Sequence, residues 1–175
     1  CSTADLTAGV HAISATYSGG ANYTGSASTG EIAVAQAPTT TTVTSAPNPS
    51  VYRETVTFTV TVDGTAGTLT GNVTVYDDGT AVGTCALSGR TCELSSADLT
   101  AGSHAITASY EGDADFAAST SDPTTHTVLR ASTTLELTGP TSSTYRETVT
   151  FTATISATDG TFDGTVSFSD GTEPI

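Results

Sequence analysis

The sequence predicts an all-β protein built from antiparallel two-sheet β-sandwiches arranged in tandem. Its 175 residues include 40 Thr and 20 Ser. Thr, Val, Ile and Tyr, which suit a pleated and half-buried surface, are abundant, and good helix formers are scarce. A long stretch of sequence recurs further along the chain, and apolar and polar residues alternate between turn signals. These three observations predict short strands that each bury one face.

The repeat is visible in two pairs of matching segments. Residues 51–59 recur as 144–152, and residues 4–13 recur as 97–106, both 93 residues later. A period of this length is about that of one seven-stranded sandwich. The phase of the repeat predicts three units: the C-terminal half of one copy at 1–37, a complete copy at 38–130, and the N-terminal half of another copy at 131–175.

Alternation with a period of two predicts the strands of the complete copy. Two of them, at 80–87 and 90–94, are expected to form a hairpin around Ser88-Gly89. The other predicted strands lie at 39–45, 54–62, around 73–75, 102–110 and 124–129. The inward positions predict a core that contains Val56, Phe58, Val60, Val73, Val75, Leu99, Ile106 and Tyr110.

Several segments of the complete copy resemble the bacterial immunoglobulin-like repeats found in tandem in large secreted and surface-anchored proteins. The segments that carry this resemblance are residues 47–52, 54–59, 71–77, 99–110 and 112–116. The resemblance implies tandem immunoglobulin-like sandwiches in an extracellular spacer or adhesin stalk. It implies no catalytic residue, because the matching positions are turn and core positions.

Cys85 and Cys92 are expected to form a disulfide bond. Their positions are symmetric about Ser88-Gly89, which places the two residues opposite each other in the predicted hairpin. The alternative is a pair of reduced, half-buried thiols. A secreted protein favours the disulfide. Cys1 aligns near Leu94 and is interpreted as the remainder of a divided hairpin or as a partner for another chain, rather than as a lipid-bearing residue.

Other reactive residues are interpreted as structural. His11 and His104 occupy the same repeat position, which suits a half-buried histidine better than a metal ligand, and His126 is treated in the same way. The acidic clusters at 77–78, 111–115 and 159–163 are interpreted as solvated turns, because no twelve-residue calcium loop is present. No serine-nucleophile elbow or zinc-protease motif occurs. The sequence therefore predicts no enzyme, no cofactor and no metal.

The net charge of −14, with four Arg and no Lys, argues against nucleic acid as a partner. No apolar run is long enough for membrane insertion. The predicted partners are neighbouring immunoglobulin-like repeats or copies of the chain itself, and any glycan or protein ligand stays unidentified. An extracellular or cell-surface location is expected.

Three functions compete. The first is a structural segment of a surface stalk, and the second is a filament subunit whose two half-domains complete one another head-to-tail between chains. The third is a carbohydrate-binding module, which usually needs exposed aromatic residues. The faces expected to meet in the second case contain Ile13, Tyr17, Ile32 and Val34 from one half, and Val149, Phe151, Ile155, Val166 and Phe168 from the other.

Overall fold

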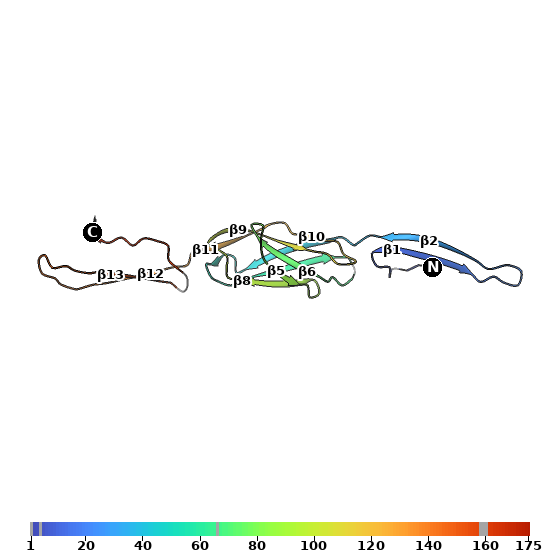
Figure 1. Cartoon of the computed structure of the whole chain (residues 1–175), viewed down its shortest axis with the longest axis horizontal. Coiled ribbons are helices and arrows are strands. Elements are labelled where there is room, and N and C mark those ends of the chain that lie inside the picture. The colour runs from blue at the N-terminus through green and yellow to red at the C-terminus, as the bar shows by residue number, and fades with distance from the viewer. Residues whose placement is uncertain (1, 4, 66, 158–160) are drawn as a thin grey trace.

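The computed structural model describes residues 2–3, 5–65, 67–157 and 161–175, and every regular element in this part of the chain is a β-strand. A sandwich occupies the centre of an elongated molecule. A hairpin extends from each side of it, β1–β2 at one end and β12–β13 at the other (Figure 1). No helix in the described part of the chain has the length and apolar character needed to cross a membrane.

Two sheets form the central domain. The smaller has the order β3-β5-β8, and the larger has the order β4-β11-β9-β6-β7, with β10 added beside β9. All of these pairs are antiparallel except β4 with β11, which is parallel. The strands are β3 (Thr39–Ala46), β4 (Ser50–Val51), β5 (Val56–Gly64), β6 (Asn72–Asp77), β7 (Thr80–Ala86), β8 (Thr91–Ser96), β9 (Gly102–Tyr110), β10 (Ser119–Thr120) and β11 (Thr124–Leu129).

The core lies between the two sheets and follows the alternation in the sequence. Along β5 the valines and Phe58 are buried, while the intervening threonines Thr57, Thr59 and Thr61 are only half-buried. Along β9 the alternate positions from His104 to Tyr110 are buried in the same way. All eight residues expected in the core have less than a tenth of their surface exposed: Val56, Phe58, Val60, Val73, Val75, Leu99, Ile106 and Tyr110.

The predicted hairpin between residues 80–87 and 90–94 is wrong. Strand β7 pairs with β6 in the larger sheet, and β8 pairs with β5 in the smaller one. The start of β8 is held at the end of β5, because the Val62 amide donates to the Arg90 carbonyl at 2.8 Å and the Arg90 guanidinium donates to the Gly64 carbonyl at 3.1 Å. The chain therefore crosses from one sheet to the other at Ser88-Gly89.

The disulfide bond between Cys85 and Cys92 consequently joins the two sheets. Cys85 lies beside Val73 in the larger sheet, and Cys92 lies beside Val60 in the smaller one. The Cα atoms of the two cysteines are 5.8 Å apart. The bond closes the edge of the sandwich where β7 and β8 face each other, instead of linking two strands of one hairpin.

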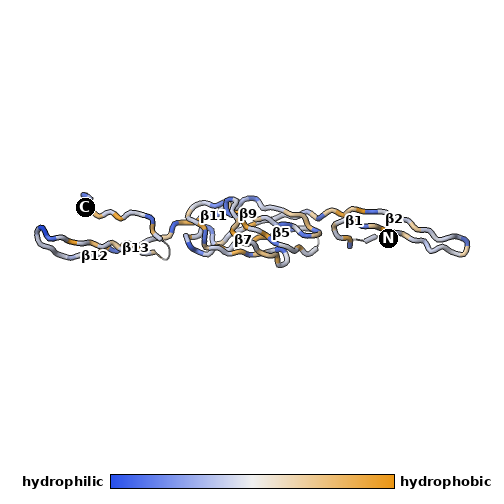
Figure 2. The backbone as a smooth tube through the Cα atoms, in the orientation of Figure 1, coloured by the Kyte–Doolittle hydropathy of each residue, from blue (hydrophilic) through white to orange (hydrophobic). Residues whose placement is uncertain are grey.

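The flanking segments form separate hairpins, and Figure 2 shows hydrophobic positions along them as well as in the central domain. Ile13 and Phe151 match Ile106 and Phe58 of the central domain in the repeat. Ile13 is 49% exposed and Phe151 is 41% exposed, against 1% and 0% for their counterparts. The flanking strands are β1 (Gly9–Tyr17), β2 (Ser26–Val34), β12 (Thr134–Thr138), β13 (Thr152–Ser156), β14 (Ser169–Asp170) and β15 (Glu173–Pro174).

Candidate functional site

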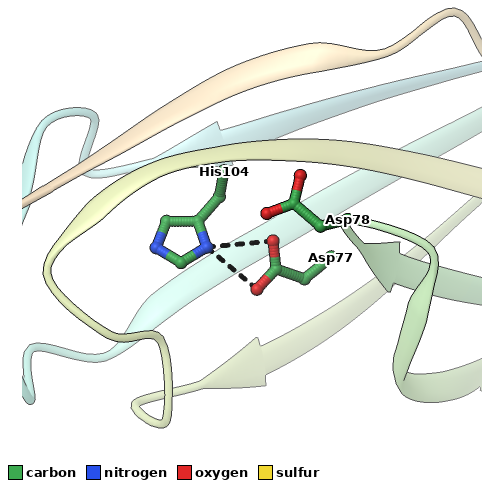
Figure 3. Close-up of side chains that lie close together, drawn as sticks. All are labelled: Asp77, Asp78 and His104. Atoms are coloured by element: carbon green, nitrogen blue, oxygen red, sulfur yellow. Dashed lines mark hydrogen bonds and ion pairs between the residues drawn. The ribbon is translucent and has the colours of Figure 1, made fainter.

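A histidine and two aspartates meet at one end of the larger sheet (Figure 3). His104 is the third residue of β9, Asp77 is the last residue of β6, and Asp78 begins the turn into β7 with a φ of 47°. The His104 Nδ1 atom lies 2.9 and 3.0 Å from the two carboxylate oxygens of Asp77. On the other side of the ring, Nε2 lies 2.8 Å from the Thr100 carbonyl oxygen.

The hydrogen-bond partners of His104 define what this cluster does. One ring nitrogen of His104 faces the Thr100 carbonyl oxygen and the other faces the Asp77 carboxylate, so both nitrogens have a partner inside the fold. The Asp78 carboxylate is also engaged, since it accepts the Ala105 amide at 3.1 Å. The cluster thus ties β6, β9 and the loop before β9 together through side-chain hydrogen bonds, with only 8% and 21% of the His104 and Asp77 side chains exposed.

The same three residues are also the one group of metal-ligand type found within the described residues, with their ligand atoms within 4.8 Å of one another. Their polar atoms already bond to each other and to the backbone, so the structural role accounts for the arrangement. The expectation of no metal and no catalytic residue stays a prediction. Sequence reasoning treated the two aspartates and His104 separately and missed their contact.

His126 is the second buried histidine, and it lies beside His104 in the β9–β11 ladder. Its Nδ1 and Nε2 atoms each lie 2.9 Å from a serine hydroxyl, those of Ser45 and Ser50. A hydroxyl donates or accepts, so the neutral ring is fully satisfied. Burial lowers the pKa of His126 below its ordinary 6.5, and the charge of nearby His104 acts in the same direction.

We expect the central domain to lose stability through His126 when the pH falls from 7.5 to 5. The unfolded ring takes up a proton near its ordinary pKa of 6.5, whereas the folded ring resists protonation. The stabilisation is therefore complete above about pH 6.5 and is lost as the pH falls from there toward the lowered pKa of the folded state. Urea unfolding across this range measures the effect, and a His126→Gln variant should show a shallower dependence on pH. Equal slopes for the two proteins would contradict the assignment.

The loop between β9 and β10 contains the second acidic cluster. Each carboxylate oxygen of Asp113 accepts two hydrogen bonds of 2.9 Å. Oδ1 accepts from the amides of Asp115 and Phe116, and Oδ2 accepts from the amide and the hydroxyl of Thr70. Burial alone would raise the pKa of Asp113, but these hydrogen bonds outweigh it and lower the pKa below its ordinary 3.8. Asp113 is therefore a structural residue of the loop rather than a solvated turn residue.

The remaining candidates contribute less to this picture. Asp159 of the third acidic cluster lies outside the described residues, as does Cys1. His11 accompanies the exposed β1 strand, and its Nε2 atom lies 2.7 Å from the Thr7 carbonyl oxygen, which repeats the contact of His104 with Thr100. The two half-domain faces lie at opposite ends of the molecule, so one chain does not bring them together (Figure 1).

Comparison with protein families finds a match to the central part of the chain. Residues 43–129 match the bacterial Ig-like domain (group 3). The central domain belongs to this family. The match spans the sandwich from β3 to β11 and confirms the resemblance on which the sequence interpretation relied. A bacterial Ig-like domain is a structural domain, and the family is generally non-enzymatic. No curated protein matches the chain.

Proposed function

We propose that the chain is a structural segment of an extracellular bacterial surface protein, in which Ig-like domains act as a stalk that holds other domains away from the cell. The proposal rests on one observation: the buried and half-buried polar side chains of the central domain form hydrogen bonds within the fold. His104, Asp77, His126 and Asp113 all bond to strands or loops of the same fold. The Cys85–Cys92 bond adds support, because disulfides persist in oxidising compartments outside the cytoplasm.

Surface labelling tests the proposed location. Antibodies raised against the central domain are expected to label intact cells of the bacterium that makes the protein, and brief protease treatment of those cells is expected to remove the label. A cytoplasmic protein probed in the same samples controls for lysis. Labelling that requires permeabilised cells would contradict an extracellular role.

A second candidate, inter-chain assembly, is favoured by the exposed faces of the flanking segments. On one side Ile13, Tyr17 and Ile32 are about half exposed, and on the other Val149, Phe151 and Val166 are nearly as exposed. Buried aliphatic and aromatic side chains contribute roughly 1.5–3 kcal/mol each. We propose that each face is covered by the complementary half of another Ig-like repeat, either in the same polypeptide or in a second copy of this chain.

Sedimentation of the 175-residue chain across a concentration series tests completion between copies. The unsubstituted chain is expected to associate, and an Ile13→Asn, Tyr17→Asn variant should associate at least tenfold more weakly, because each lost side chain removes more than about 1.4 kcal/mol. Ala12→Asn, on the opposite face of β1, is the matched control. A chain that stays monomeric at high concentration would exclude this route and leave completion within one polypeptide.

No comparable observation favours carbohydrate binding. The described aromatic residues of the central domain are buried or half-buried, and the exposed aromatic residues lie in the flanking segments.

A further inference from the structure

The loop between β9 and β10 contacts the flanking segment that precedes the central domain. The Asp115 Oδ1 atom accepts the Ala8 amide at 2.7 Å, just before β1 begins. The same loop holds the linker after β2, because the Ala37 amide donates to the Asp115 carbonyl at 2.8 Å and the Ala117 amide donates to the Ala37 carbonyl at 2.9 Å. One loop therefore forms hydrogen bonds with the preceding segment at two separate points, Ala8 and Ala37.

The loop is already shaped for this contact by the central domain. Phe116 is buried, and the Asp113 amide donates to the Phe116 carbonyl at 2.9 Å. Gly112 has a φ of +82°, and a Cβ atom there would lie 2.8 Å from the Phe116 carbonyl oxygen. Any larger residue at this position would have to distort the loop.

The first repeat copy shows whether the shape of the loop depends on its two carboxylates, because it lacks both of them. The matching positions there are Gly20, Asn22 and Tyr23 in place of Asp113, Asp115 and Phe116. The Gly20 amide still donates to the Tyr23 carbonyl at 2.9 Å, which is the contact made by Asp113 and Phe116. The turn thus forms without either carboxylate. Among the described residues, Asp115 is the one loop residue whose side chain bonds to the preceding segment. Its carboxylate is dispensable for the turn, which the first copy forms without it.

We propose that the loop at residues 112–117 is a docking element between consecutive repeats, in which Asp115 fixes the Thr-Ala-Gly turn of the preceding repeat. The turn at residues 7–9 recurs as 100–102 at the other end of the central domain. The central repeat therefore carries the docking loop at one end and a copy of the target turn at the other. This inference deepens the proposed stalk role, because two-point attachment between repeats resists bending at the junction.

Amide hydrogen exchange in the 175-residue chain tests the proposal. Ala8 and Ala101 are the matching residues of the two Thr-Ala-Gly turns. Among the described residues, only the Ala8 amide donates to a carboxylate. Ala8 is expected to exchange more slowly than Ala101 in the unsubstituted chain. In Asp115→Ala its exchange should accelerate by about tenfold or more, because a hydrogen bond to a charged acceptor is lost. Asp115→Asn keeps an acceptor and should give an intermediate rate.

Two controls separate docking from general destabilisation. Asp122→Ala removes an exposed aspartate of the next loop and should leave the Ala8 rate unchanged. The amides of β5 should keep their slow exchange in all variants, since the core is untouched. An Ala8 rate that equals the Ala101 rate in the unsubstituted chain, or that does not change in Asp115→Ala, would overturn the proposal. The cell-labelling result does not bear on this outcome, so failure of either claim is distinguishable.

Discussion

Replacing Phe58 with alanine is expected to lower the free energy of unfolding of the central domain by about 3–5 kcal/mol. Phe58 lies in the middle of β5, is fully buried, and meets the ring of His126 edge-on with centroids 6.4 Å apart. Its loss removes a large apolar side chain and leaves a cavity between the two sheets. The cavity would also disturb the histidine that Ser45 and Ser50 hold in place.

Denaturant unfolding measures this change, and Thr57→Ala is the matched control. Thr57 immediately precedes Phe58 in the same strand and points to the other face, and its hydroxyl lies 3.1 Å from the Ser95 hydroxyl. Its replacement should cost less than about 1 kcal/mol, as for a half-exposed hydroxyl hydrogen bond. Equal shifts of the two midpoints would show that the assignment of the inward face of β5 is wrong.

Removal of the Cys85–Cys92 bond is expected to cost about 2.5 kcal/mol, the chain-entropy value for so short a closed loop. A Cys85→Ala, Cys92→Ala variant should unfold at a lower urea concentration than the parent. Reductant should shift the parent toward the variant and leave the variant unchanged. Because the bond joins the two sheets, we expect the loss to appear as a lower stability of the whole sandwich.

Intact mass with alkylation tests the bond directly. The thiols of Cys85 and Cys92 are expected to react with an alkylating reagent only after reduction. Alkylation of both residues without reductant, in protein prepared under oxidising conditions, would contradict the disulfide.

Local alternation was enough to predict the strands and the buried face of the central domain. Val56, Phe58 and Val60 occur at every second position, and a strand places such positions on one face. The sheet to which each strand belongs is not a local property. Residues 80–86 and 91–96 are adjacent in sequence, yet they pair with different neighbours because Arg90 is held at the end of β5.

The contacts of the candidate site could not be predicted from the sequence for the same reason. Asp77 and His104 are 27 residues apart, and Asp115 and Ala8 are 107 residues apart. No spacing rule links residues at such distances before the strand order is known. The recurrence of histidine at 11 and 104 was a usable signal for a structural position, and the nearby threonine carbonyl at each site accounts for it.

Single-molecule force spectroscopy on the native polypeptide that carries this sequence tests the stalk account most directly. A stalk of Ig-like repeats should give evenly spaced unfolding events, one for each 93-residue repeat. Each event should lengthen the chain by roughly 250–300 Å, from about 3.5 Å per extended residue less the folded length and any cystine loop. A trace without regularly spaced events, or with spacings unrelated to this length, would contradict a stalk made of Ig-like repeats.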